Sequence, residues 1–182
     1  MYLSAKTILT VYGKLSRHAE KLEDLIRNAA IGSFSDITPC DIQAERICLL
    51  IEKKNTIVNL KVKARKAMLS LRQEEIEILA HRFCNKGNLY YSKSSYFRRL
   101  RSALKSYTEA LILQGITDEI FQTEYADKIA FIGSAMDLCL ADENAINARK
   151  KGLKLNKAFA KKTYTICQAM AEGVYSSSSF SS

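Results

Sequence analysis

Apolar side chains recur every three or four residues over long stretches of this chain, and almost nothing interrupts them. Only one proline and seven glycines occur in 182 residues, so few positions force the backbone out of a helix. This spacing is typical of amphipathic helices, because residues three and four apart share a face. Hydrophobic residues make up 47% of the chain, which is enough to form a core. The pattern predicts an all-α fold.

Residues 1–70 are expected to form a long antiparallel helical hairpin. A helix over 3–30 carries a seam with one polar member: Ile8, Val11, Leu15, His18, Leu22, Leu25 and Ala29. A second helix, which ends near Met68, has a similar seam: Ala44, Cys48, Ile51, Asn55, Val58 and Val62. A second stripe flanks that seam: Ile47, Leu50, Ile57, Leu60, Ala64 and Met68. We expect His18 and Asn55 to be buried polar residues that fix the register of the pair.

Two further helices are predicted within residues 71–115. The segment 71–83, "LRQEEIEILAHRF", has acidic residues in its first turn, where the helix dipole favours them. A second helix is expected from Ser92, as its cap, to about Gln114, and Gly115 can close it. Residues 90–107 contain five Lys or Arg and no acidic residue. The interval from Cys84 to Tyr91 is only eight residues.

These two segments resemble region 4 of the sigma-70 family of bacterial transcription factors, and the sigma-like regulators of phages and mobile elements. In the first segment, the matching residues are Leu71, Glu75, Glu77, Ile78, Leu79, Arg82 and Phe83. In the second segment they are Ser92, Ser95, Tyr96, Arg99, Leu100, Ala103 and Leu104. An upstream helical hairpin is similar to that of phage regulators and uncharacterised Gram-positive proteins, so the resemblance covers about residues 3–115.

The resemblance implies a helix-turn-helix whose second helix enters the major groove of DNA. Helical spacing then predicts an inward face: Tyr96, Leu100, Ala103, Leu104 and Tyr107. The expected DNA-binding residues are Lys93, Ser94, Phe97, Arg98, Arg99, Arg101 and Lys105. The family places about fifteen residues and a positioning helix before the capping serine. The eight residues here indicate a truncated helix-turn-helix.

The charge distribution favours a polyanionic partner. The net charge is +9, and residues 41–115 hold 15 of the 28 Lys and Arg but only 7 of the 19 Asp and Glu. Double-stranded DNA is the expected partner of a transcriptional regulator. RNA polymerase or another protein, and a second copy of the chain, are further expected partners. Two alternatives are a helical protein–protein adaptor and an RNA-binding protein that uses a basic stripe: Lys150, Lys154, Lys157 and Lys161.

Catalytic and metal-binding motifs do not stand out in the sequence. It contains two histidines and lacks a Gly-rich phosphate loop, an HExxH and a GxSxG motif. His81 and Cys84 lie close together, but a zinc site needs four ligands. Five cysteines lie at irregular spacings: Cys40, Cys48, Cys84, Cys139 and Cys167. We expect these to be buried free thiols, and we expect no enzyme activity, cofactor or metal.

The last third of the chain, residues 116–175, is expected to contain amphipathic helices. Its first apolar face comprises Ile120, Phe121, Tyr125, Ile129, Ile132 and Met136. A second face comprises Gly152, Leu155, Phe159, Ile166 and Met170. The polar tail 176–182 is expected to be disordered. Charges interrupt every apolar run and the start does not resemble a signal peptide, which predicts a cytoplasmic protein that does not bind membranes.

Overall fold

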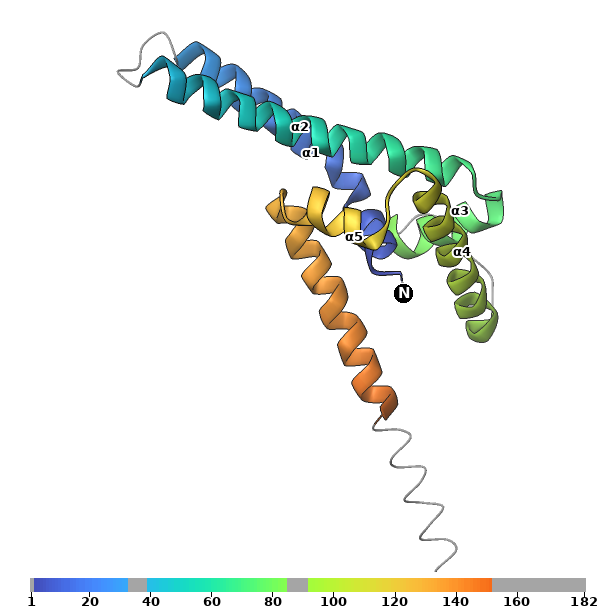
Figure 1. Cartoon of the computed structure of the whole chain (residues 1–182). Coiled ribbons are helices and arrows are strands. Elements are labelled where there is room, and N and C mark those ends of the chain that lie inside the picture. Colours follow the sequence, from blue (N-terminus) through green and yellow to red (C-terminus); the bar gives the residue numbers. More distant parts are fainter. Residues whose placement is uncertain (1, 33–38, 85–91, 152–182) are drawn as a thin grey trace, which may run out of the picture. The chain divides into compact units, whose positions relative to one another are not determined.

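All regular secondary structure in the computed structural model is helical over residues 2–32, 39–84 and 92–151, which are the residues it describes. The all-α prediction is therefore confirmed for these ranges. None of these helices is both long and apolar enough to cross a membrane. The elements, shown in Figure 1, are α1 (Leu3–Gly32), α2 (Cys40–Leu69), α3 (Gln73–Cys84), α4 (Lys93–Leu113), α5 (Asp118–Phe121) and the π-helical turn η1 (Gln122–Ala126), and residues 130–151 are also helical.

The chain divides into two compact units, residues 1–139 and 140–182. Within the second unit the structure describes only residues 140–151, which are helical and mostly exposed. The predicted apolar face from Gly152 to Met170, most of the predicted basic stripe, and the tail 176–182 lie outside the described residues. Most of the described residues therefore belong to the first unit.

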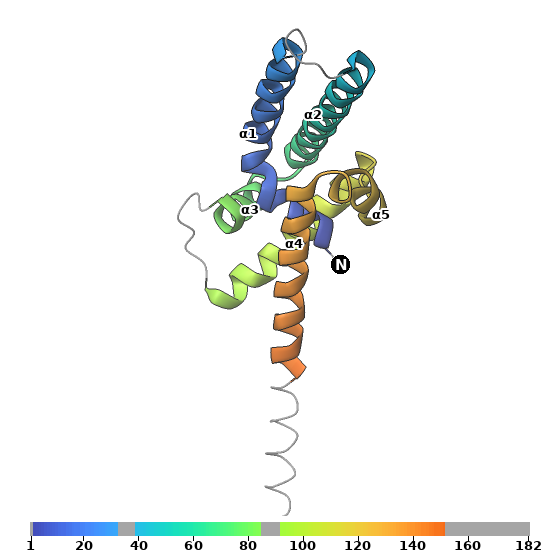
Figure 2. The ribbon, with the colours of Figure 1, turned by 90° about the vertical axis from the view of Figure 1, so that its left-hand side faces the viewer.

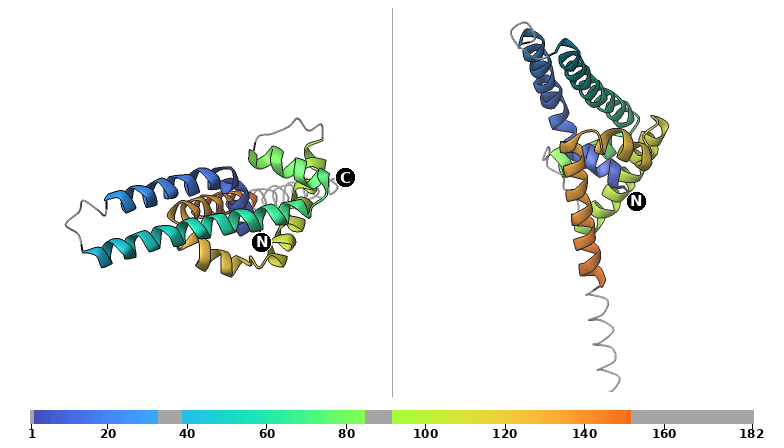
Figure 3. Two further views of the ribbon diagram at one scale, coloured as in Figure 1. Left: turned by 90° about the horizontal axis from the view of Figure 1, so that it is seen from above. Right: turned by 60° about the vertical axis from the view of Figure 1, so that its left-hand side comes forward.

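The helices α1 and α2 lie side by side and run in opposite directions (Figures 1 and 2). Lys54 Nζ of α2 forms an ion pair with Glu23 Oε2 of α1 at 3.1 Å. Lys61 Nζ, two turns further along α2, donates to Ser16 Oγ at 2.6 Å. Residue numbers therefore rise along one helix as they fall along the other. The view from above in Figure 3 shows the same pairing.

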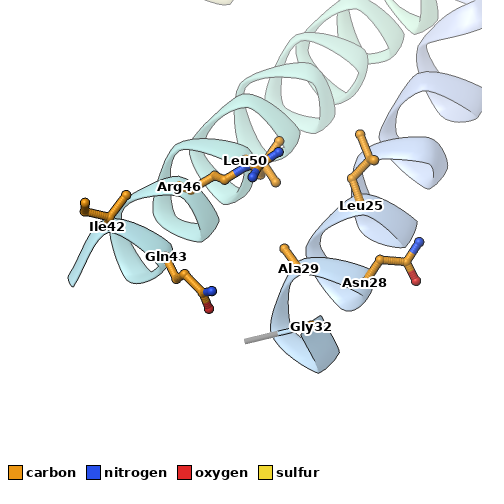
Figure 4. Close-up of a pocket in the computed structure, with 8 residues that line it drawn as sticks. All are labelled: Leu25, Asn28, Ala29, Gly32, Ile42, Gln43, Arg46 and Leu50. Atoms are coloured by element: carbon orange, nitrogen blue, oxygen red, sulfur yellow. The ribbon is translucent and has the colours of Figure 1, made fainter. Parts of the chain in front are cut away.

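Only one end of this helix pair contributes to the core. The buried residues of α1 lie between Ser4 and Leu15, and those of α2 lie between Ile57 and Ala67. There the pair contacts α3, α4, α5 and η1. The far ends of α1 and α2 instead border an open cleft of about 340 Å³, with Leu25 and Ala29 on one wall and Leu50 on the other (Figure 4). Among the described residues that line the cleft, Arg46 is the one with an ionisable side chain.

The core contacts of α2 come from its second apolar stripe and not from its first. Ile57, Leu60 and Ala64 are buried, whereas Asn55 is exposed. The prediction that Asn55 is a buried polar residue of the seam is therefore wrong. The physical reason is that α2 is apolar on two opposite faces, and periodicity alone does not indicate which face finds a partner.

His18 is half-buried and makes an aromatic contact. Its ring stacks on Phe131, with ring centroids 3.8 Å apart and planes 7° from parallel. Burial, and the positive charges of Lys21, Lys14 and Arg17, lower the pKa of His18 below 6.5 because both effects disfavour the imidazolium. Phe131 lies 113 positions further along the chain, so this contact joins α1 to the last helix.

Residues 116–139 belong to the same compact unit as α1 to α4. Phe121, Tyr125 and Ile132 are buried among residues of the earlier helices in one cluster. Thr117 Oγ1 accepts a hydrogen bond from the backbone N–H of Ile120 at 3.2 Å and so caps α5. The Ser4 hydroxyl donates to the Asp118 carboxylate, which attaches α5 to the start of α1.

Gly133 allows the last helix to pass close to η1. A Cβ atom at this position would lie 2.9 Å from the carbonyl oxygen of Ala126. Because that neighbour is backbone, it cannot swing aside as a side chain would. The absence of a side chain at Gly133 therefore permits the close approach of the two segments.

The described cysteines are more exposed than predicted. Cys40, Cys48 and Cys84 are exposed free thiols and Cys139 is half-buried, so the expectation of buried thiols is wrong for the exposed three. Cys40 and Cys84 are the first residue of α2 and the last of α3, and Cys48 lies on the outer face of α2. Cys167 lies outside the described residues.

Candidate nucleic-acid interface

The helix α4 carries the residues predicted to bind DNA. Ser92 occupies the N-cap position as predicted, although its side chain makes no capping hydrogen bond to the backbone. Gln114 follows the last turn, and Gly115 has a φ of +74°, a left-handed conformation that glycine adopts without strain. The predicted end of this helix is therefore confirmed. Residues 85–91, the shortened connection before α4, lie outside the described residues.

The inward face of α4 packs on the core of the unit. Leu100, Ala103, Leu104 and Tyr107 are buried, and Tyr96 is half-buried. The predicted inward face is therefore confirmed. These side chains fix the rotation of α4 about its axis, so the opposite side of the helix faces solvent.

Most of the predicted DNA-binding residues lie on the outward side of α4. At about 100° per residue, four of them follow one line along the helix: Ser94, Arg98, Arg101 and Lys105. Lys93 and Phe97 flank this line, and all six are exposed. We call these six residues the outer face of α4. No acidic residue occurs between Lys93 and Thr108, so the face has one sign of charge until Glu109, which lies 3.8 Å from Lys105 Nζ.

Arg99 lies apart from this face. Its Nη1 donates to Glu74 Oε2 of α3 at 2.8 Å, and 45% of its side chain is exposed. The structure therefore places Arg99 between α3 and α4, whereas the sequence grouped it with the outward residues. Its ion pair stabilises the arrangement of the two helices only modestly, because both partners remain in contact with water.

Glu75 is the main polar connection between α3 and α4. It is only 8% exposed. Its Oε2 accepts from the backbone N–H of Arg72 at 3.2 Å, which caps α3 in the manner of a capping box. Its Oε1 accepts from the Arg72 guanidinium at 3.2 Å and from the Ser106 hydroxyl of α4 at 2.8 Å. The sequence identified Glu75 as a match to the sigma pattern but did not reveal its bond to Ser106.

These hydrogen bonds keep Glu75 ionised. Burial alone would raise its pKa, but the hydrogen bonds from Arg72 and Ser106 and the charge of Arg72 outweigh burial, so the pKa of Glu75 lies below its usual value of 4.5. A carboxyl group whose pKa is lower in the folded than in the unfolded state stabilises the protein above its unfolded pKa. That contribution is lost as the pH falls below about 4.5.

The variant Glu75→Gln is expected to lower the free energy of unfolding by about 1–3 kcal/mol at pH 7, because it weakens charge-assisted bonds at a buried site. The variant should also lose less stability than the wild type between pH 5 and pH 3. Urea denaturation followed by circular dichroism at several pH values measures both effects. The exposed neighbour Glu77, changed to Gln, serves as control. Equal stability of Glu75→Gln and Glu77→Gln at pH 7 would contradict this role.

A second contact joins the last turn of α3 to α4. His81 Nδ1 lies 3.2 Å from the Tyr96 hydroxyl, and the two rings meet edge to face. The Nδ1 atom of His81 therefore contacts the Tyr96 hydroxyl in this structure. Over residues 2–32, 39–84 and 92–151, no three His, Cys, Asp or Glu side chains gather in a way that could hold a metal ion.

Comparison of the chain with protein-family models, with curated proteins and with solved structures gives no match.

Proposed function

We propose that this protein is a DNA-binding transcriptional regulator that places the outer face of α4 in the major groove. In this proposal α3 and α4 form a sigma region 4-like helix-turn-helix, and α1 and α2 form the helical hairpin that precedes it. The observation that carries the proposal is the outer face of α4, which is basic, exposed and free of acidic residues for four turns. The buried opposite face supports it, because a fixed helix can present side chains in one orientation.

Each outward residue has a chemical role in this proposal. Arg98 and Arg101 lie one turn apart and contact guanine edges or phosphates, for which the forked guanidinium is suited. Lys93 and Ser94, in the first turn of α4, contact phosphate, which the helix N-terminus also favours. Phe97, 56% exposed, contacts thymine methyl groups. Lys105 extends the phosphate contacts at the other end of the face.

Arg99 supports the interface indirectly in this proposal. Its pairing with Glu74 helps to hold α3 against α4, as does the hydrogen bond of Glu75 with Ser106. These contacts substitute in part for the positioning helix of the sigma family, because they fix α4 from the side of α3.

The proposal predicts strongly salt-dependent binding to duplex DNA. If the four basic residues of the outer face each neutralise one phosphate, log K should fall with log salt with a slope of about −4, at roughly 0.9 per contact. Fluorescence anisotropy with a labelled random 30-bp duplex, from 50 to 300 mM salt, measures the slope. A single-stranded RNA competitor of equal length tests the RNA-binding alternative. No duplex binding at 50 mM salt, or stronger binding of the RNA, would contradict the proposal.

A protein-binding role is the second candidate. The observation that favours it is the number of large apolar side chains that the first unit leaves exposed, among them Phe97 and Leu113 of α4. Exposed apolar side chains that lie close together can form a site for another protein. If this second candidate is correct, the outer face of α4 binds an acidic or apolar surface of another protein, such as RNA polymerase. The same anisotropy series then detects no binding to duplex DNA.

A further inference from the structure

The helix α2 exposes a mostly apolar stripe on the side away from the core. We call it the outer stripe, and its members are Ala44, Cys48, Ile51, Asn55, Val58, Val62 and Leu69. Ile51, Val58 and Val62 are 40%, 41% and 46% exposed, and Leu69 is 72% exposed. A single exposed apolar residue needs no explanation, but a stripe about 38 Å long at 1.5 Å per residue does.

The outer stripe is separate from the surface that α2 uses within its own chain. At about 100° per residue, its axis lies roughly 150° around α2 from the buried residues Ile57, Leu60 and Ala64. Lys54 and Lys61, which bond to Glu23 and Ser16 of α1, lie between the two faces. A partner could therefore cover the outer stripe without displacing the contacts that these described residues of α2 make with α1 and with the core.

The spacing of the outer stripe is that of a coiled-coil seam. Its members alternate steps of four and three, with Arg65 as the link between Val62 and Leu69. In heptad terms, Cys48, Asn55, Val62 and Leu69 occupy a positions, and Ala44, Ile51, Val58 and Arg65 occupy d positions. One asparagine at an a position in such a seam typically fixes register and the number of helices, at some cost in stability. This spacing favours another helix of the same kind as the partner.

The charges along α2 indicate how a second copy of that helix would be oriented. The first half of α2 carries three acidic and three basic residues and so has no net charge, whereas its second half carries Lys61, Lys63, Arg65 and Lys66 and no acidic residue. In a parallel pair, the two basic halves would face and repel each other. In an antiparallel pair each basic half faces a half without net charge, and the helix dipoles also oppose each other. Repulsion between the basic halves therefore disfavours the parallel pair and selects the antiparallel one.

We propose that the outer stripe is the interface of an antiparallel homodimer, in which α2 packs on α2 of a second copy. The register that uses the whole stripe places Ile51 opposite Val62 of the second copy and Ala44 opposite Leu69 of the second copy. It also places Glu45 beside Lys66 of the second copy. The two Asn55 side chains then lie one layer apart on either side of the two-fold axis. This proposal does not depend on DNA binding.

Sedimentation equilibrium of the full chain from 1 to 200 μM tests the dimer. The wild type is expected to dimerise within this range, and Ile51→Lys/Val62→Lys to raise the dissociation constant at least 10-fold. The control Leu49→Lys/Leu113→Lys changes two apolar residues that are at least as exposed and lie off the stripe, and it should dimerise like the wild type. A monomeric wild type, or equal effects of the two variants, would overturn the proposal.

Disulfide cross-linking tests the orientation. In a chain whose five cysteines are changed to alanine, Ile51→Cys/Val62→Cys should form a cross-linked dimer on oxidation, while either change alone should not. In the antiparallel register, the two copies of residue 51 are about 16 Å apart along the axis, too far for a disulfide. In a parallel dimer each single variant would cross-link. Cross-linking of either single variant, or none in the double variant, would overturn the antiparallel arrangement.

Discussion

Replacing Arg98 and Arg101 together with alanine is expected to weaken binding to duplex DNA by roughly 30-fold to 20,000-fold, because each lost contact costs about 1–3 kcal/mol. The side chains are exposed, so the variant should keep the helix content and stability of the wild type. The slope of log K against log salt should become less steep by about 2 if both residues contact phosphate. Anisotropy at several salt concentrations measures both quantities.

The matched control is Arg27→Ala/Lys53→Ala. It removes the same charge from exposed positions on α1 and α2, so its effect reports only the loss of net charge. We expect less than a 5-fold change in affinity for this control. If the double variant on α4 and the control weaken binding equally, α4 is not the DNA-binding element. If neither double variant changes the affinity or the slope of log K against log salt, the proposed mechanism is wrong.

Phe121→Ala is expected to lower the free energy of unfolding by about 3–5 kcal/mol, the usual loss for a fully buried aromatic side chain. Phe121 is completely buried and stacks near Tyr125, with ring centroids 6.0 Å apart. It belongs to a core cluster that includes Ile8 and Leu15 of α1. The substitution should therefore destabilise α1 as well as α5.

Urea denaturation measures the loss, and amide hydrogen exchange in α1 shows whether the destabilisation extends there. The neighbouring residue supplies the control, because Ile120 is 39% exposed and Ile120→Ala should cost less than about 1 kcal/mol. If Phe121→Ala left exchange in α1 unchanged, α5 and η1 would not share a cooperative core with α1.

The sequence predicted features that depend on one helix at a time. The two faces of α4 are an example, since Leu100 and Leu104 are buried and Arg98 and Arg101 are exposed, as their spacing indicates. The end of α4 just before Gly115 is another, because the signal is local. Likewise, the long helices among the described residues follow from periodicity and from the scarcity of proline.

Features that depend on a contact between two distant segments could not be predicted from the sequence. The two apolar stripes of α2 have the same periodicity, so Asn55 could not be assigned to the exposed face. Arg99 and Glu74 are 25 positions apart, and their pairing separates Arg99 from the other arginines of α4. The contact of Ser106 with Glu75 similarly requires knowing how α3 and α4 meet.

The attachment of residues 118–139 to α1 also has a consequence for protein synthesis. Ser4 bonds to Asp118, and Thr10 Oγ1 lies 4.0 Å from Cys139 Sγ. The apolar side of α1 is translated before residues 118–139, so these partners leave the ribosome more than a hundred residues later. Until then, Ile8 and Leu15 lack part of their native cover, and the nascent chain presents a binding site for chaperones.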